Sequence, residues 1–146
     1  MAIWHPDSKD FIALSKQYVK NSILEHLDIQ FVELSEETLS ATMPVDRRTH
    51  QPFGILHGGA SAVLAETLAS VAGNLCVDHK SEHCVGMSIN ASHMRSVKSG
   101  RVKGIARALH LGKKTQVWQV DIFHEKKLLC QSRVSLAVVS KNKGES

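Results

Sequence analysis

The chain has 146 residues, of which 42% are hydrophobic and 22% are charged. This composition indicates a single folded domain with its own core and excludes an intrinsically disordered chain. The net charge of +4 favours small anionic partners. We expect no nucleic-acid partner, because the basic residues are scattered and aromatic residues make up only 5%.

The first fifty residues predict one helix, two strands and a loop. Asp7 or Ser8 can cap a helix whose apolar side chains share one face, as in a packing helix or a lid. Two later stretches alternate apolar with polar side chains, the pattern of a strand, and Pro44 ends the second. In the loop, the acidic and basic side chains of residues 46–48 are expected to pair with each other or with water. The expected bounds are 7–20 for the helix, 27–31 and 38–43 for the strands, and 46–50 for the loop.

The next segment predicts a long helix with two different faces. No proline interrupts residues 57–77, a length that makes a helix roughly 30 Å long. One stripe carries large apolar side chains, and the neighbouring stripe carries small ones that let another backbone or a ligand come close. Glu66, the only charged residue of the segment, lies on the small stripe. The large stripe is Leu64, Leu68, Val71 and Leu75, and the small one is Gly59, Ala62, Val63, Glu66, Ala69, Ser70 and Gly73.

The remaining sequence predicts four strands that follow one another as a meander, separated by polar turns. The last strand is apolar on both faces, which predicts a central position in the sheet. Because no repeat or linker is present, residues 1–146 are expected to form one α+β domain with the helix against an antiparallel sheet. The first of the four strands is expected to place Val85, Met87, Ile89 and Ala91 on one face. The strands are expected at 85–91, 102–109, 115–123 and 128–139, the turns at 78–83, 98–100, 112–114 and 125–127, and a frayed tail at 141–146.

The sequence shows no pattern typical of export, membrane insertion or metal binding. The first residues lack the basic start and apolar core of a signal peptide, and no apolar run approaches the roughly 18 residues of a membrane span. The three cysteines, Cys76, Cys84 and Cys130, form no Cys-x-x-Cys pair. We therefore expect a cytoplasmic protein with reduced thiols and no membrane partner. His79 and His83 lie between the first two cysteines, but the spacing is not that of a standard zinc site, so we predict no metal.

Two features of the long helix admit a catalytic and a structural interpretation. Glu66 is either a general base or nucleophile held against a substrate, or an edge carboxylate that reaches water or an arginine. His57 and the Gly58–Gly59 pair stand at the expected helix start, where free N–H groups and the helix dipole suit an anion or a polarised carbonyl oxygen. The alternative is that the glycines only let the loop turn into the helix. An acid two turns into a helix with such a start suggests acyl chemistry.

This segment also resembles a known pattern. Gln51–Pro–Phe–Gly54, His57–Gly58–Gly59, Glu66 and Ser70 are similar to the core motif of hotdog-fold acyl-CoA thioesterases. The similarity is greatest to the branch that contains the menaquinone-pathway 1,4-dihydroxy-2-naphthoyl-CoA hydrolases and the enterobactin proofreading thioesterases. It spans residues 27–139 and includes residues 41–46, Asn90–Ala91 with His93 and Arg95, residues 109–112 and residues 116–118. The resemblance implies an antiparallel sheet wrapped around one long central helix.

The resemblance implies a role for each polar residue of the motif. The Gly58 N–H would polarise the thioester carbonyl, and Glu66 would be the nucleophile or the general base. Gln51 and Ser70 would orient the water and the carboxylate, and His57 would orient the carbonyl or assist the leaving group. No cofactor is implied, since coenzyme A is part of the substrate.

Coenzyme A would be held by two groups of residues that can meet phosphates or allow close approach of the backbone. For some of them a structural role is the alternative: Lys113 and Lys114 could be only an exposed hairpin, and His93 a buried hydrogen-bonded side chain. The first group is Gly86, His93, Met94, Arg95 and Ser96, and the second is His110, Leu111, Gly112, Lys113, Lys114 and Thr115.

The resemblance also implies partners. A homodimer paired through a sheet edge would share its active sites, with Glu66 acting on substrate held by Gly58 of the other subunit, and a homotetramer is expected. The substrate would be an aromatic or medium-chain acyl-CoA, in a pocket walled by the Phe53 loop and the helix face around Val63 and Val71. The alternatives are a thioesterase that clears misloaded acyl or aryl groups from a carrier protein, a hotdog dehydratase, and a non-catalytic acyl-CoA binding module. The dehydratase is disfavoured because its histidine lies in a proline-rich loop, and the binding module because it would not need all four polar motif residues.

Overall fold

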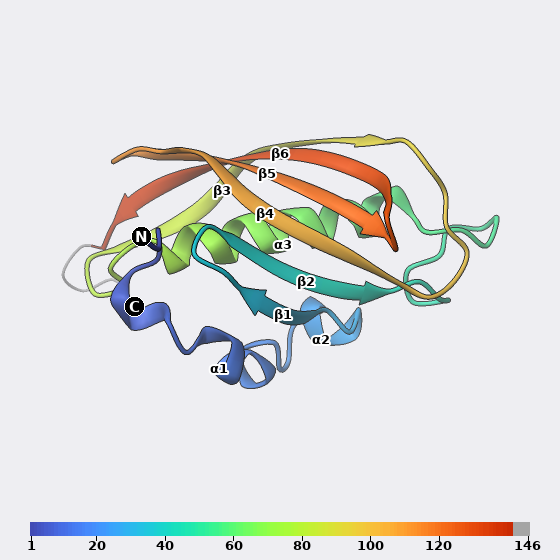
Figure 1. Ribbon diagram of the computed structural model, residues 1–146, viewed down its shortest axis with the longest axis horizontal. Coiled ribbons are helices and arrows are strands. Elements are labelled where there is room, and N and C mark those ends of the chain that lie inside the picture. The colour runs from blue at the N-terminus through green and yellow to red at the C-terminus, as the bar shows by residue number, and fades with distance from the viewer. Residues whose placement is uncertain (142–146) are drawn as a thin grey trace.

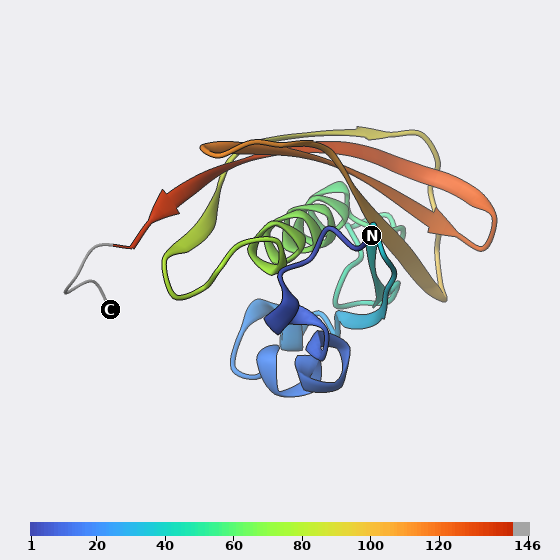
Figure 2. The same ribbon diagram turned by 60° about the vertical axis from the view of Figure 1, so that its left-hand side comes forward.

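The long helix α3 (Gly58–Leu75) lies along the concave face of a six-stranded antiparallel sheet (Figures 1 and 2). The computed structural model describes residues 1–141, and residues 142–146, on which the predicted tail falls, lie outside the described residues. The expected α+β arrangement, with one long helix packed on an antiparallel sheet, is confirmed. Within residues 1–141, no helix is both long and apolar enough to cross a membrane.

The sheet has the order β1-β2-β4-β5-β6-β3, so β1 and β3 are its edges. The position of β6 between β5 and β3 confirms that the last strand is internal. Its strands are β1 (Gln30–Leu34), β2 (Thr38–Pro44), β3 (Glu82–His93), β4 (Arg101–Leu111), β5 (Thr115–His124) and β6 (Lys127–Ser140).

The predicted four-stranded meander is wrong in one respect. Only β4, β5 and β6 are consecutive neighbours, whereas β3 pairs with β6 and not with β4. The connection after His93 crosses to the middle of the sheet instead of turning back at residues 98–100 (Figure 1). It is held there by backbone bonds from Met94 N–H to Leu129 O and from Leu56 N–H to Val97 O, at 2.8 and 2.9 Å. Alternation identifies a strand but not its neighbour, which is why the order was mispredicted.

A β-bulge in β3 changes which side chains face the helix. The register shifts between Gly86 and Ser88, so that Gly86 lies opposite Leu136 and Ile89 lies opposite Val134. Leu136 and Val134 are fully buried, so Gly86 and Ile89 point to the helix side. The expectation that residues 85, 87, 89 and 91 share one face is therefore wrong, because the extra residue of a bulge reverses the alternation.

The N-terminal segment forms three short helices in place of one. Asn21, with a φ of 60°, ends the first α-helical stretch, and Ser22 caps the next through its bond from Leu24 N–H at 3.2 Å. Phe11 packs edge-on against Phe31 of β1, with ring centroids 5.0 Å apart. The helices are η1 (Pro6–Ser8), α1 (Phe11–Tyr18) and α2 (Ile23–His26), and they cover the edge of the molecule next to β1 (Figure 2).

The two predicted stripes of α3 are present. The large side chains are buried against the sheet, as expected. The small stripe is less uniform, because Ala69 and Gly73 are buried while Gly59 and Glu66 are exposed and Ser70 is half-buried. Glu66 therefore stands on an open strip of the helix, next to edge strand β3.

Candidate active site

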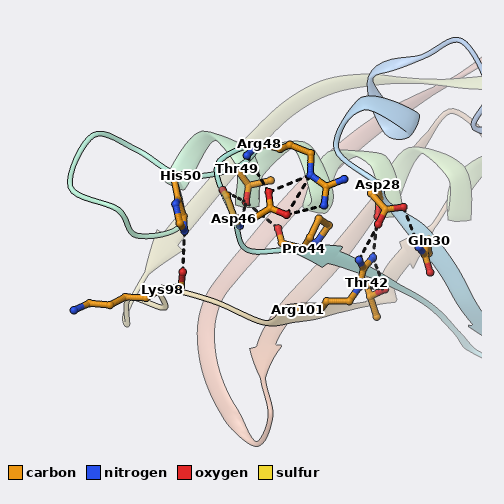
Figure 3. Close-up of polar contacts among 10 residues, drawn as sticks. All are labelled: Asp28, Gln30, Thr42, Pro44, Asp46, Arg48, Thr49, His50, Lys98 and Arg101. Atoms are coloured by element: carbon orange, nitrogen blue, oxygen red, sulfur yellow. Dashed lines mark hydrogen bonds and ion pairs between the residues drawn. The ribbon is translucent and has the colours of Figure 1, made fainter.

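Polar contacts fix the part of the β2–α3 loop that follows β2 (Figure 3). Arg48 pairs with Asp46, with 2.6 Å between Arg48 Nη2 and Asp46 Oδ2, which confirms the expected pairing. The hydrogen bond from Arg48 lowers the pKa of Asp46 to about 2. The Thr49 hydroxyl donates to Pro44 O at 2.8 Å, and His50 Nε2 lies 2.8 Å from Lys98 O. The loop that carries the motif is thus anchored to β2 and to the β3–β4 connection.

The tip of this loop is a tight turn that presents an aromatic ring. Gln51 N–H donates to Ile55 O at 2.8 Å, Gly54 N–H donates to Gln51 O at 2.9 Å, and the Gln51 side-chain oxygen accepts from Phe53 N–H. Gly54 has a φ of 79°, a conformation that other residues rarely adopt. Phe53 is 89% exposed. Because the side-chain oxygen of Gln51 is used inside the turn, only its side-chain N–H groups remain to orient a water molecule, which is its predicted role.

His57 caps the helix start. Its Nδ1 accepts a hydrogen bond from Gly59 N–H at 2.7 Å, so a neutral ring carries its proton on Nε2. Gly58 and Gly59 both have negative φ, so the turn into the helix does not require glycine. They provide space instead: a β-carbon on Gly59 would lie 2.8 Å from His57 Nδ1. A left-handed backbone conformation is therefore not the reason for the glycine pair, and its catalytic role stays a prediction.

Gly58 lies at the bottom of a groove beside His93. A β-carbon on Gly58 would stand 3.0 Å from His93 Nε2, so the imidazole packs directly on the glycine. The Gly58 N–H donates no hydrogen bond within residues 1–141 and is free for a ligand oxygen. The groove has a volume of about 400 Å³ and is lined by Ile55, Leu56, Gly58, Ser61, His93, Met94, Arg95, Ser96 and Leu129. The first predicted coenzyme A group therefore adjoins the predicted oxyanion donor, except for Gly86.

Glu66 lies against Gly86. A β-carbon on Gly86 would be 2.7 Å from Glu66 Oε1, a distance that real contacts do not show. Ser70 follows one turn later on the same helix face and is half-buried. Carboxylate and hydroxyl thus border the same open strip beside β3.

One copy of the chain does not bring all the predicted site residues together. Glu66 follows Gly58 by eight residues, which is about 12 Å along a helix that rises about 1.5 Å per residue. The second coenzyme A group lies on the β4–β5 hairpin, where Lys114 O accepts from Val138 N–H at 2.8 Å. His93 pairs with Cys130, eight residues away from Val138 along β6 and roughly 26 Å distant at about 3.3 Å per residue. His93 and the second coenzyme A group therefore stand near opposite ends of β6, whereas Gly86, which pairs with Leu136, lies close to the second group.

Residues 1–141 form other hollows as well. One of about 320 Å³ is lined in part by His110 and Leu111 of the second predicted coenzyme A group. A larger hollow of about 670 Å³ lies between the N-terminal helices and β1, and no predicted site residue lines it. In the described part of the chain, no three or more histidine, cysteine or acidic side chains gather to hold a metal. The three cysteines are free, and burial raises the pKa of Cys76 to about 12 and that of Cys84 to about 11.

The structure also draws attention to a residue that no sequence pattern singled out. Asn74 lies on the Glu66 face of α3, eight residues further along, and bonds to both backbone groups of Cys84 on β3. Helical spacing from Glu66 was the signal available in the sequence, but its partner on a distant strand was not.

Comparisons with known proteins agree with this geometry. Residues 53–131 match the family described as Thioesterase superfamily. The chain belongs to the thioesterase superfamily. It is 52% identical over 121 residues to the 1,4-dihydroxy-2-naphthoyl-CoA hydrolase of Escherichia coli, covering 82% of this chain and 88% of that protein. It is 50% identical over 119 residues to the proofreading thioesterase EntH of Cronobacter turicensis, covering 81% and 86%.

A solved thioesterase has the same architecture. The crystal structure of a mutant of thioesterase PA1618 from Pseudomonas aeruginosa superposes with a TM-score of 0.92 at 45% identity, covering 96% of this chain and 100% of that one. The chain therefore has the hotdog fold and is a thioester hydrolase. The expected family and fold are confirmed. The matching family and relatives are named as thioesterases and hydrolases, which disfavours both a dehydratase and a non-catalytic binding module.

Proposed function

We propose that this thioesterase hydrolyses aromatic acyl-CoA thioesters in sites shared between two copies of the chain. Gly58 of one copy polarises the carbonyl, and Glu66 of the other acts as nucleophile or general base. The observation that carries the proposal is the separation of about 12 Å between these residues along one helix. A single carbonyl needs both groups within about 3 Å of its reacting atoms, which one copy does not offer.

The free edge of β3 is the surface on which the second copy pairs. Within residues 1–141, β3 has no neighbouring strand on its outer side, and its Val85, Met87 and Ile89 side chains are 43%, 55% and 37% exposed. An exposed apolar edge strand is a surface on which another strand pairs. A second copy thus removes both unpaired backbone groups and apolar surface from water.

Two-fold antiparallel pairing of β3 with itself brings the separated groups together. Gly86, with Glu66 beside it, lies in the first half of β3, and His93, with Gly58 beside it, is the last residue of the strand. In an antiparallel pair each end meets the opposite end of its partner. The Gly58 N–H of one copy then faces Glu66 of the other, and the groove beside His93 meets the hairpin with Lys113 and Lys114. A tetramer remains a prediction.

Each group has a definite task in the reaction. The free Gly58 N–H, at the positive end of α3, stabilises negative charge on the carbonyl oxygen. As a base, Glu66 takes a proton from water while the water oxygen bonds to the carbonyl carbon and the C–S bond breaks. As a nucleophile, its oxygen bonds to that carbon and displaces the thiolate, and water then cleaves the anhydride. The exposed Nε2–H of His57 can donate to the carbonyl or to the departing sulfur, while Gln51 and Ser70 orient the water and the carboxylate.

The substrate is proposed from the relatives and from the charges at the site. A relative at 52% identity is named for a naphthoyl-CoA thioester, which supports an aromatic acyl group. Arg95 takes part in no ion pair within residues 1–141 and lines the groove, so its guanidinium is available for a phosphate. Phe53 and the α3 face around Val63 are the proposed apolar walls.

Thiol release from benzoyl-CoA and octanoyl-CoA tests the proposal. We expect Glu66→Gln to lose at least ~100-fold in kcat while remaining folded, which is the contribution typical of a catalytic acid or base. Glu33→Gln, an exposed acid on the opposite edge strand β1, is the matched control. Full activity of Glu66→Gln would exclude the mechanism, and equal rates with both substrates would exclude the aromatic preference.

Mixed dimers test the shared site. When Glu66→Gln and Gly58→Pro chains are combined, a shared site leaves one intact site in each mixed dimer, and random assembly predicts about a quarter of wild-type activity. Sites confined to one chain predict no recovery. The mixture therefore separates the two arrangements without any change of substrate.

A carrier protein is the second candidate, after coenzyme A, for the molecule that carries the acyl group as a thioester. The similarity to the proofreading thioesterase EntH supports the alternative that this chain clears acyl or aryl groups from a carrier's phosphopantetheine arm. Assays of the same enzyme with benzoyl-CoA and with a benzoylated carrier protein distinguish the two, because the preferred substrate gives the higher kcat/KM.

A further inference from the structure

Asn74 joins α3 to edge strand β3 through a pair of backbone contacts. Its Nδ2 donates to Cys84 O at 3.1 Å, and its Oδ1 accepts from Cys84 N–H at 2.8 Å. The same Nδ2 donates to Ser70 O at 2.8 Å. The carboxamide therefore binds Cys84 as a neighbouring strand would, and ties it to the helical turn that begins at Ser70.

This clamp between Asn74, Cys84 and the Ser70 turn lies next to the contact between Glu66 and Gly86. Cys84 precedes Gly86 by two residues on β3, and Asn74 follows Glu66 by eight residues on the same face of α3. Helix and strand thus touch at two successive points, Glu66 against Gly86 and Asn74 against Cys84. The first contact is tight, since a β-carbon on Gly86 would lie 2.7 Å from the carboxylate. The second sets how closely helix and strand approach there.

We propose that Asn74 is a positioning residue for hydrolysis: by clamping Cys84 to the Ser70 turn of α3, it holds the Glu66 carboxylate in its reactive place beside Gly86. This inference rests on the proposed function, because it gives Asn74 its effect through Glu66. Asn74 touches neither the substrate nor the reacting atoms. Its removal lowers the rate of the chemical step and leaves the groove around His93 and Arg95 unchanged.

The clamp needs an amide. Aspartate at position 74 keeps an acceptor for Cys84 N–H but sets a negative oxygen against the carbonyls of Cys84 and Ser70. Alanine removes all three hydrogen bonds. Both Asn74→Ala and Asn74→Asp are therefore expected to release the strand from the helix.

Ser8 offers a matched control at the same end of α3. Its buried hydroxyl belongs to the N-terminal segment and donates to Leu75 O at 2.9 Å, and within residues 1–141 Ser8 makes no hydrogen bond to β3. Ser8→Ala removes a buried hydrogen bond from the helix end while leaving the contact between α3 and β3 intact. A merely stabilising role for Asn74 predicts the same kinetic result for both variants.

Steady-state hydrolysis of benzoyl-CoA by the full chain is the test. For Asn74→Ala and Asn74→Asp we expect kcat to fall about tenfold with KM within about twofold, because misplacing a catalytic group by a fraction of an ångström slows chemistry without weakening binding. Ser8→Ala should keep its kcat. In a double-mutant cycle, Gly86→Ala should cost less in the Asn74→Ala background than in wild type, since the loosened strand can move away from Glu66.

Amide hydrogen exchange measures whether Asn74 holds β3 against α3, and it does so independently of any activity assay. The Cys84 and Gly86 N–H groups should exchange faster in Asn74→Ala than in Ser8→Ala. If wild type turns over and Asn74→Ala keeps its kcat, or the cycle is additive, the positioning role is wrong while the thioesterase assignment stands. If wild type hydrolyses no thioester offered, the proposed function fails and the positioning role fails with it, whatever the exchange rates show.

Discussion

The carboxylate of Glu66 lies so close to the backbone of Gly86 that a β-carbon on residue 86 would stand 2.7 Å from Glu66 Oε1. Gly86→Ala must therefore displace the carboxylate, and we expect kcat/KM for benzoyl-CoA to fall about 10-fold or more. Ser88→Ala, an exposed position on the same strand that faces away from α3, is the control and should keep wild-type kinetics. Unchanged kinetics in Gly86→Ala would show that Glu66 works from another position.

The role of the Gly58 N–H can be separated from the space that glycine provides. Gly58 is the first residue of α3, where proline is well tolerated, and His57, with ψ 131°, already has the conformation required before proline. Gly58→Pro removes the N–H, whereas Gly58→Ala keeps it and adds a similar contact with His93. We expect the proline variant to be about 100-fold slower in kcat than the alanine variant. Equal rates would rule out this N–H as the oxyanion donor.

His57 combines a cap and an imidazole, and two substitutions distinguish them. His57→Asn retains an acceptor for Gly59 N–H, whereas His57→Ala should lower the free energy of unfolding by about 1 kcal/mol. If the imidazole acts on the thioester, both variants lose kcat by about 10-fold or more, and only the alanine variant loses stability. Urea unfolding and thiol-release assays measure the two effects. Full activity of His57→Asn would show that His57 only caps the helix and takes no part in the reaction.

The two edge strands allow a controlled test of the dimer. Met87 on β3 and Val32 on β1 are 55% and 44% exposed, and only the first lies on the proposed pairing edge. A lysine on an edge strand opposes pairing. We expect Met87→Lys to sediment as a monomer with little activity, and Val32→Lys to sediment and react as wild type. A dimer that survives Met87→Lys but not Val32→Lys would move the interface to β1.

The Asp46–Arg48 pair should make the stability of the motif loop depend on pH. The pKa of Asp46 is lowered from 3.8 to about 2 by the Arg48 hydrogen bond. Because the folded pKa is depressed, the stabilisation is present above about pH 4 and is lost as the pH falls toward 2. The difference in unfolding free energy between wild type and Asp46→Asn should shrink over that window in urea titrations. A difference that stays constant or grows on acidification would contradict this assignment.

Patterns along the chain were sufficient for the elements that local rules govern. The proline-free run with two contrasting stripes predicted α3, and alternation predicted the strands, because period and chain stiffness are local properties. The motif from Gln51 to Ser70 was sufficient for the family. The sequence by itself therefore determined the long helix, the presence of the strands, the fold class and the chemical type of the candidate site, but not the division of the N-terminal segment into three short helices.

Only the tertiary structure decided how these parts meet. The alternation of β3 is compatible with either neighbour, and its bulge at Gly86 reverses which side chains face Glu66. Asn74 acquires its partner only when Cys84 is brought beside the helix. The rise of the helix alone separates Gly58 from Glu66 in one copy, but only the sheet order shows that β3 has a free edge on which a second copy could complete the site. Strand order and edge exposure depend on hydrogen bonds and packing between residues far apart in sequence, which no local pattern specifies.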